Sequence, residues 1–139
     1  MPAFADCVSM VRTPPRVLVA EDSATQRAVC VDVLRDAGFE VHEAPDGRYA
    51  LDICRIIRPD LLILDLGLPR LAGMDLLRKL RDDRKIGQTP VVIVTSDDRP
   101  ETAEAAFYEG ATDLLTKPVD AQDLIVRVQD ALGVAAGLG

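Results

Sequence analysis

Residues 61–69 read LLILDLGLP, a run of four bulky aliphatic residues that ends in Asp65. A short aliphatic run without polar alternation is typical of a strand buried on both faces, as in a parallel sheet. The following Gly67 and Pro69 indicate a loop and not the start of a helix. The stretch therefore predicts a parallel strand whose carboxyl end presents an acidic side chain.

Four similar runs accompany this one, at residues 17–20, 39–44, 91–95 and 112–116. Only the segment from Phe39 to Glu43 alternates between apolar and polar side chains, which places that strand at an edge of the sheet. Segments with helical spacing separate the runs, and each strand-plus-helix unit takes about 25 residues. The alternation predicts an α/β fold, with a five-stranded parallel sheet, helices on both faces and right-handed crossovers: a three-layer sandwich.

The ends of several helices are also visible in the sequence. Ser23 is a suitable N-cap after the first strand, and Asp120 is suited to cap a final helix over residues 121–132. Gly38 and Gly110 follow helical segments, where a residue with positive φ commonly ends the helix. These signals divide the chain into regular strand-to-helix units.

The chain has 139 residues, of which 48% are hydrophobic and 28% are charged, values typical of one globular domain. We expect the domain at residues 16–132, between an N-terminal extension at 1–15 and a C-terminal tail at 133–139. The composition excludes a disordered or collagen-like chain.

Charge and cysteine content exclude further classes of protein. The net charge of −7 argues against direct binding of nucleic acid. Cys7, Cys30 and Cys54 are odd in number and lack the spacing of a zinc site, so we expect reduced thiols. Because no apolar run approaches the roughly 20 residues that span a bilayer, we expect a cytoplasmic protein without membrane contact.

Acidic residues follow two of the predicted strands. Glu21 and Asp22 come directly after residues 17–20, and Asp65 ends the third strand. Ligands of such sheets bind outside the carboxyl ends of the strands, and three carboxylates meeting there either repel one another or bind a cation. Oxygen ligands without His or Cys favour Mg²⁺. The alternative for Asp22 is a helix cap.

The last two strands bring a hydroxyl group and an ammonium group to the same edge. The fourth strand ends in Thr95 and Ser96, and the fifth is followed by Lys117 and Pro118. Taken singly, Thr95 reads as a strand-end cap and Lys117 as a solvated charge. Together with the carboxylates they form a site with charges of both signs, which suits a phosphoryl group held against a cation.

These residues resemble the receiver domain of two-component response regulators over about residues 16–132. The motifs that carry the resemblance are Glu21-Asp22, Asp65 with Pro69 and Gly73 behind it, Thr95-Ser96 and Lys117-Pro118. The resemblance implies the flavodoxin-like strand order 2-1-3-4-5, as in stand-alone chemotaxis regulators, and a Lys117–Pro118 peptide that is cis. The chain then corresponds to a stand-alone receiver or to the N-terminal receiver of a longer regulator.

The resemblance also implies the roles of the acidic residues and the lysine. Asp65 is the nucleophile, and thus the modified residue, that accepts a phosphoryl group from a histidine kinase or a phosphotransfer protein. Lys117 pairs with the phosphoryl oxygens. Mg²⁺ is held by four residues: Glu21, Asp22, Asp65 and the backbone carbonyl of Gly67.

Two departures from the family pattern concern the switch and the lifetime of the acyl phosphate. By resemblance, Thr95 turns its hydroxyl to the phosphoryl group, and in the family an aromatic ring three residues before the lysine then swings inward. This chain has Leu114 at that position. The usual output surface on the fourth helix and fifth strand is therefore in doubt. Gly67 has no side chain to influence hydrolysis of the acyl phosphate, so we hypothesise that water access depends on Asp97.

The predicted function is a phosphorylation-dependent signalling switch that acts on a downstream target protein or output domain. It catalyses only its own phosphorylation and dephosphorylation, and is a monomer or a weak, phosphorylation-dependent homodimer. Three alternatives remain: a receiver-fold interaction module that acts without phosphorylation, a Mg²⁺-dependent phosphohydrolase with an aspartyl nucleophile, and a flavodoxin-like cofactor binder. The last two lack their usual motifs after the first strand, where Glu21-Asp22-Ser23 stands.

Overall fold

The sequence folds around one parallel sheet, seen in a computed structural model that describes residues 13–133. Its strands are β1 (Arg16–Ala20), β2 (Glu40–Ala44), β3 (Leu61–Asp65), β4 (Val91–Thr95) and β5 (Asp113–Thr116). Their order is β2-β1-β3-β4-β5, and every neighbouring pair is parallel. The predicted fold class and strand order are confirmed.

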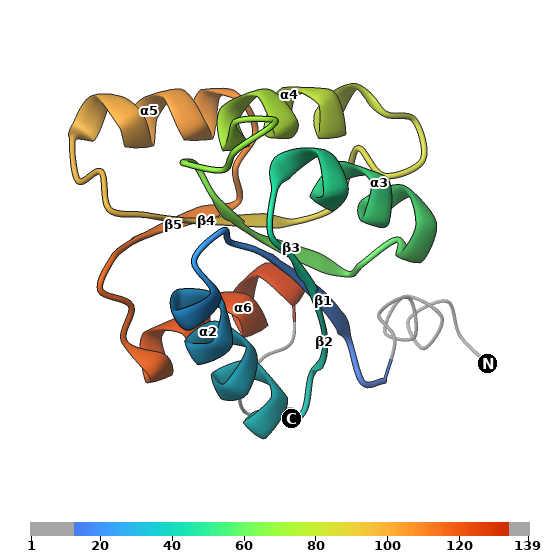
Figure 1. The fold of residues 1–139 in the computed structure, drawn as a ribbon, viewed down its shortest axis with the longest axis vertical. Coiled ribbons are helices and arrows are strands. Elements are labelled where there is room, and N and C mark those ends of the chain that lie inside the picture. The colour runs from blue at the N-terminus through green and yellow to red at the C-terminus, as the bar shows by residue number, and fades with distance from the viewer. Residues whose placement is uncertain (1–12, 134–139) are drawn as a thin grey trace.

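Helices cover both faces of the sheet and complete three layers (Figure 1). On one face lie α2 (Ala24–Asp36) and α6 (Ala121–Leu132), and on the other lie α3 (Gly47–Ile57), α4 (Gly73–Asp82) and α5 (Pro100–Tyr108). Each face has its own buried cluster of aliphatic side chains, centred on Leu62 and Leu64 toward α3 and α4, and on Leu61 and Ile63 toward α2 and α6. Neighbouring residues of β3 thus point to opposite cores, which explains its unbroken aliphatic run.

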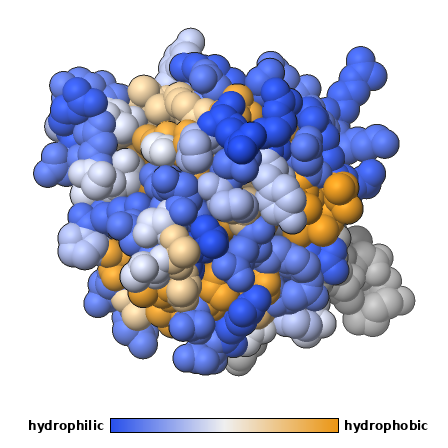
Figure 2. All heavy atoms as spheres, viewed as in Figure 1, coloured by the Kyte–Doolittle hydropathy of each residue, from blue (hydrophilic) through white to orange (hydrophobic). Residues whose placement is uncertain are grey.

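The surface of the molecule in Figure 2 is mainly hydrophilic, with separate apolar patches, one of them over the layer of α2 and α6. Val29 on α2 and Val126 on α6 are about half exposed. Within residues 13–133, no helix is long and apolar enough to cross a bilayer.

The local signals agree with the structure to within one residue. β2 is an edge strand as predicted, and its His42 is half exposed and hydrogen-bonded to Glu40. Phe39 lies outside the strand because its N–H donates to a carbonyl at the end of α2. The Oγ of Ser23 and a carboxylate oxygen of Asp120 accept hydrogen bonds from the first turns of α2 and α6, as predicted.

Several predictions concern segments outside the described residues. Most of the N-terminal extension (residues 1–12), Cys7, and the tail at residues 134–139 lie there. Cys30 and Cys54 are described and are free thiols.

The loop between β3 and α4 is held close to the end of β3 by Gly73. A Cβ atom at this position would lie 2.5 Å from the carbonyl oxygen of Asp65, so only glycine permits the approach. The N–H of Gly73 donates to the carbonyl of Leu66 at 3.1 Å. The start of α4 therefore packs directly against the residue at the carboxyl end of β3.

Candidate functional site

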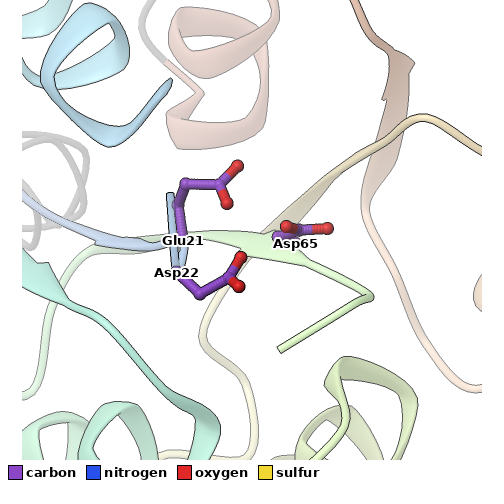
Figure 3. Close-up of side chains that lie close together, drawn as sticks. All are labelled: Glu21, Asp22 and Asp65. Atoms are coloured by element: carbon purple, nitrogen blue, oxygen red, sulfur yellow. The ribbon is translucent and has the colours of Figure 1, made fainter. Parts of the chain in front are cut away.

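Three carboxylates meet at the carboxyl edge of the sheet (Figure 3). Glu21 and Asp22 leave the end of β1 and Asp65 ends β3, and these two strands are hydrogen-bonded neighbours. Their carboxylates offer oxygens that all lie within 4.8 Å of one another. The condition on which the sequence prediction depended, adjacency of the first and third strands, is met.

The three acids differ in their surroundings. Glu21 is 6% exposed and Asp65 is 9% exposed, whereas Asp22 is exposed to solvent. Oε2 of Glu21 accepts the N–H of Ser23 at 3.1 Å, and Oδ1 of Asp65 accepts the N–H of Gly67 at 3.1 Å. Burial raises the pKa of Glu21, and the neighbouring carboxylate acts in the same direction against the lowering effect of the Lys117 ammonium. The helix cap is Ser23, so the capping alternative for Asp22 is wrong.

Lys117 reaches these carboxylates from the loop after β5. Its Nζ lies 2.6 Å from Oε1 of Glu21 and 3.4 Å from Oδ2 of Asp65. Burial by itself would lower the pKa of Lys117, but its contacts with Glu21 and Asp65 outweigh burial and hold the pKa above its usual value. The lysine is therefore a charged member of the site and not a solvated surface charge. Its peptide bond to Pro118 is cis, as the family resemblance implied.

Thr95 closes the site from β4. Its side chain is nearly buried, and its Oγ1 accepts the N–H of Asp97 at 3.1 Å. The N–H of Lys117 donates to the carbonyl of Thr95 at 2.8 Å, which ties the two loops together. A hollow of about 350 Å³ opens between these residues, lined by Asp65, Leu66, Gly67, Thr95, Ser96, Asp97 and Lys117. The sequence-predicted acid, hydroxyl and ammonium groups thus face one space.

The carboxylate of Asp97 has its own partners in the loop between β4 and α5 and in the first turn of α5. Arg99 donates to it from its backbone and its guanidinium, and the hydroxyl of Thr102 donates at 2.7 Å. These contacts hold the pKa of Asp97 well below its usual range, and the hydrogen bond from the Arg99 side chain has the largest effect. The carboxylate is thus ionised and bound by its own loop and the start of α5, while the residue still lines the hollow.

Leu114 lies at the centre of β5, paired in register with Ile93, and packs against the apolar cluster on the α3, α4 and α5 side of the sheet. It occupies the place that the resemblance gives to an aromatic switch residue. A leucine there has no ring to exchange between buried and exposed positions.

The carboxylate cluster fits a hard divalent cation. The donors are oxygen atoms with a combined charge of −3, opposed within the site by one lysine. Such a donor set without nitrogen or sulfur is typical of Mg²⁺ and not of zinc. Gly67 is next to the cluster, since its N–H is bonded to Asp65.

Sequence reasoning missed two residues in the first turn of α2, Gln26 and Arg27, which together make three contacts around the site. Arg27 donates to the backbone carbonyl of Glu21 at 2.7 Å and to Glu43 of β2 at 3.0 Å. The side-chain oxygen of Gln26 accepts a hydrogen bond from Lys117. Both residues are ordinary helix formers in a helical segment, so no local signal distinguishes them.

Comparisons with known proteins agree with this geometry. The sequence profile of the response regulator receiver domain matches residues 17–129. The two-component response regulator ORR11 of Oryza sativa subsp. indica is 35% identical over 113 residues, which are 80% of this chain and 76% of that protein. The transcriptional regulatory protein PdtaR of Mycobacterium tuberculosis is 36% identical over 120 residues, 86% of this chain but 57% of that protein. The chain thus spans little more than half the length of PdtaR.

Solved structures show the same fold. The chemotaxis response regulator CheY4 of Vibrio cholerae matches with a TM-score of 0.80 and 32% identity, over 84% of this chain and 98% of that chain. The receiver domain of the sensor histidine kinase PA1611 from Pseudomonas aeruginosa matches with a TM-score of 0.80 and 26% identity, over 86% and 98%. That structure has a magnesium ion coordinated in its active site cleft.

Proposed function

This chain belongs to the response regulator receiver domains of two-component signalling, and on that premise we propose that Asp65 accepts a phosphoryl group and thereby switches a protein-binding surface. The observation that carries the proposal is the setting of Asp65. It is a largely buried carboxylate at a strand end, next to the acidic pair and in contact with the Lys117 ammonium group, which also contacts Glu21. Asp65 is also the only one of the three acids that lines the hollow of about 350 Å³.

The proposed donor is a phosphohistidine of a histidine kinase or phosphotransfer protein. A carboxylate oxygen of Asp65 forms a P–O bond to the phosphorus as the P–N bond to the donor imidazole breaks. The electron pair of that bond stays on the imidazole nitrogen, and the product is an acyl phosphate. Before the reaction, the N–H of Gly67 and the ammonium of Lys117 hold the two carboxylate oxygens in fixed directions. Lys117 also places a positive charge where the phosphoryl oxygens arrive.

Glu21, Asp22 and Asp65 would hold Mg²⁺, with the backbone carbonyl of Gly67 as the further protein ligand. When bound, the ion supplies charge neutralisation for the transferring phosphoryl oxygens. The support for this assignment is the donor set itself, together with the magnesium ion in the PA1611 receiver domain.

The switch starts from Thr95. We propose that its hydroxyl turns from the Asp97 N–H, which it accepts at rest, to a phosphoryl oxygen. The loop that leads into α5 then moves with it, and the change is read by a downstream target protein or output domain. With Leu114 in place of an aromatic ring, this movement is transmitted mainly by the loop and α5. Release of Asp97 from Arg99 and Thr102 would be needed before it could affect water access to the acyl phosphate.

In this proposal the protein is a signalling switch and does not turn over an external substrate. It works in the cytoplasm, without contact to membrane or nucleic acid through this domain. It is a monomer, or a weak homodimer when phosphorylated.

The test is the intact mass after incubation with acetyl phosphate and Mg²⁺, for the native chain, for Asp65→Ala, and for the native chain without Mg²⁺. We expect one added phosphoryl group only in the native chain with Mg²⁺. Absence of an adduct, with Mg²⁺ binding and rapid release of inorganic phosphate, would favour the phosphohydrolase alternative. Absence of both the adduct and Mg²⁺ binding would favour an interaction module that acts without phosphorylation.

A further inference from the structure

The ammonium group of Lys117 has three oxygen partners, each from a different part of the fold. Nζ lies 2.6 Å from Oε1 of Glu21, 2.5 Å from Oε1 of Gln26 and 3.4 Å from Oδ2 of Asp65. Glu21 follows β1, Gln26 lies in the first turn of α2 and Asp65 ends β3. An ammonium group has three N–H donors, so its capacity is filled at rest.

The three partners are not equivalent. The contact with Asp65 is about as long as a hydrogen bond can be, while those with Glu21 and Gln26 are short. A phosphoryl group attached to Asp65 brings its own oxygens into the space between that carboxylate and the ammonium. A phosphoryl oxygen would therefore replace Asp65 as the acceptor of the third N–H of Lys117. The hydrogen bonds to Glu21 and Gln26 set the direction of that N–H.

Of these two partners, only Gln26 is outside the carboxylate cluster. Glu21 belongs to the proposed Mg²⁺ ligands and shares its charge with them. Gln26 is neutral, and its backbone N–H bonds to the N-cap Ser23, which fixes the start of the helix that carries it. It lines a second hollow, of about 460 Å³, which Lys117 also lines and Asp65 does not, whereas Asp65 and Lys117 share the hollow of about 350 Å³.

We propose that Gln26 is a positioning residue for phosphoryl transfer: its amide oxygen holds the Lys117 ammonium so that the third N–H points to the phosphoryl group on Asp65. The inference rests on the proposed phosphorylation of Asp65. It gives a specific task to a residue that the sequence presents as an ordinary helix former.

The test compares the native chain with Gln26→Leu and Gln26→Met. Both variants remove the amide oxygen and replace the glutamine with an apolar side chain of similar size. Three quantities are measured: the affinity for beryllofluoride, which mimics a phosphoryl group on a carboxylate, the affinity for Mg²⁺ alone, and the NMR signal of the Lys117 side-chain nitrogen. We expect beryllofluoride binding to weaken by about five- to ten-fold in both variants, the effect of losing one exposed hydrogen bond to a charged group. We expect Mg²⁺ affinity to change by less than about two-fold and the Lys117 signal to shift.

Gln122→Leu is the matched control, because Gln122 is an exposed glutamine in the first turn of α6 that lines neither hollow. It should leave all three quantities unchanged. Unchanged beryllofluoride affinity, or an equal loss of Mg²⁺ and beryllofluoride affinity in the Gln26 variants, would overturn the proposal. If the native chain bound Mg²⁺ but no beryllofluoride, the proposed function would fail. In that case the NMR signal still tests the contact: the same Lys117 signal in the native chain and in the Gln26 variants would reject it.

Discussion

Replacing Asp22 with asparagine should stabilise the folded protein in the absence of divalent cations. Asp22 is the exposed member of the carboxylate cluster, and its side chain lies within 4.8 Å of both Glu21 and Asp65. Lys117 contacts the other two acids, and no hydrogen bond or ion pair joins it to Asp22 in the described structure. The substitution therefore removes two like-charge pairs and keeps the attractive ones.

The size of the effect follows from the distance between the charges. Two unit charges 4.8 Å apart repel by about 1 kcal/mol in a medium like water and by about 3.5 kcal/mol at an effective dielectric constant of 20. Because Asp22 is exposed, the lower figure applies, and solvent ions screen it further. The two pairs together amount to about 2 kcal/mol before screening, and ions at ordinary buffer strength reduce this repulsion. We expect Asp22→Asn to raise the free energy of unfolding by about 1 kcal/mol at low ionic strength, and by less in high salt.

Mg²⁺ should reverse this order of stability. A ligand that binds only the folded state stabilises it by about 1.4 kcal/mol when its free concentration is tenfold above the dissociation constant. The native chain should gain this stabilisation, and Asp22→Asn should lose most of it because one of the ion's ligands is weakened.

The assay is urea unfolding followed by far-UV circular dichroism, with and without Mg²⁺, at low and high salt. Asp32→Asn is the control, since Asp32 is an exposed residue of α2 outside the cluster and its variant should keep the native response to Mg²⁺. The reasoning fails if Asp22→Asn is less stable than the native chain without divalent cations, or if it keeps the full Mg²⁺ response.

Three further predictions concern the stability of the fold. Gly47→Ala should lower the free energy of unfolding by about 2–4 kcal/mol in a urea titration, because a Cβ there would lie 1.8 Å from the carbonyl oxygen of Leu71; a loss below about 0.5 kcal/mol would contradict the close approach. Burial raises the pKa of Cys54 from 9.0 to about 12, so the thiol loses its proton at lower pH in the unfolded chain than in the folded one. The free energy of unfolding should therefore fall as the pH rises from 9.0 towards 12. Urea titrations across this pH range should show a smaller fall for Cys54→Ala. Arg81 makes four hydrogen bonds to three backbone carbonyls, so Arg81→Leu should cost about 2–3 kcal/mol in thermal or urea unfolding, whereas Arg84→Leu at an exposed position should cost little.

The strands were predictable because burial leaves a periodic record. The side chains of Leu61 to Leu64 point alternately into two cores, so every position is apolar. β2 pairs with a neighbour on one side only, and its residues from Glu40 alternate between polar and apolar up to His42. The helix caps at Ser23 and Asp120 were equally local, since each bonds to a residue three positions away. Strand ends differed by one residue where a neighbouring backbone contact, such as that of Phe39, decided the boundary.

The site was predictable only in part. The sequence places Glu21, Asp22 and Asp65 at strand ends, but their meeting depends on β1 and β3 being neighbours. The family resemblance implied that order, and residue patterns alone left it open. The charge state and contacts of Lys117 also followed from the fold, because burial and two carboxylates act on it together.

The sequence by itself determined the fold class, the edge strand and the acidic character of the site, since these depend on local runs and on which side chains are buried. Only the tertiary structure decided that Gln26 contacts Lys117, 91 residues away, and that Asp97 is bound by Arg99 and by Thr102 at the start of α5. The physical reason is that hydrophobic burial repeats with the period of a strand or helix. A single hydrogen bond between distant side chains has no period, and so it leaves no pattern along the chain.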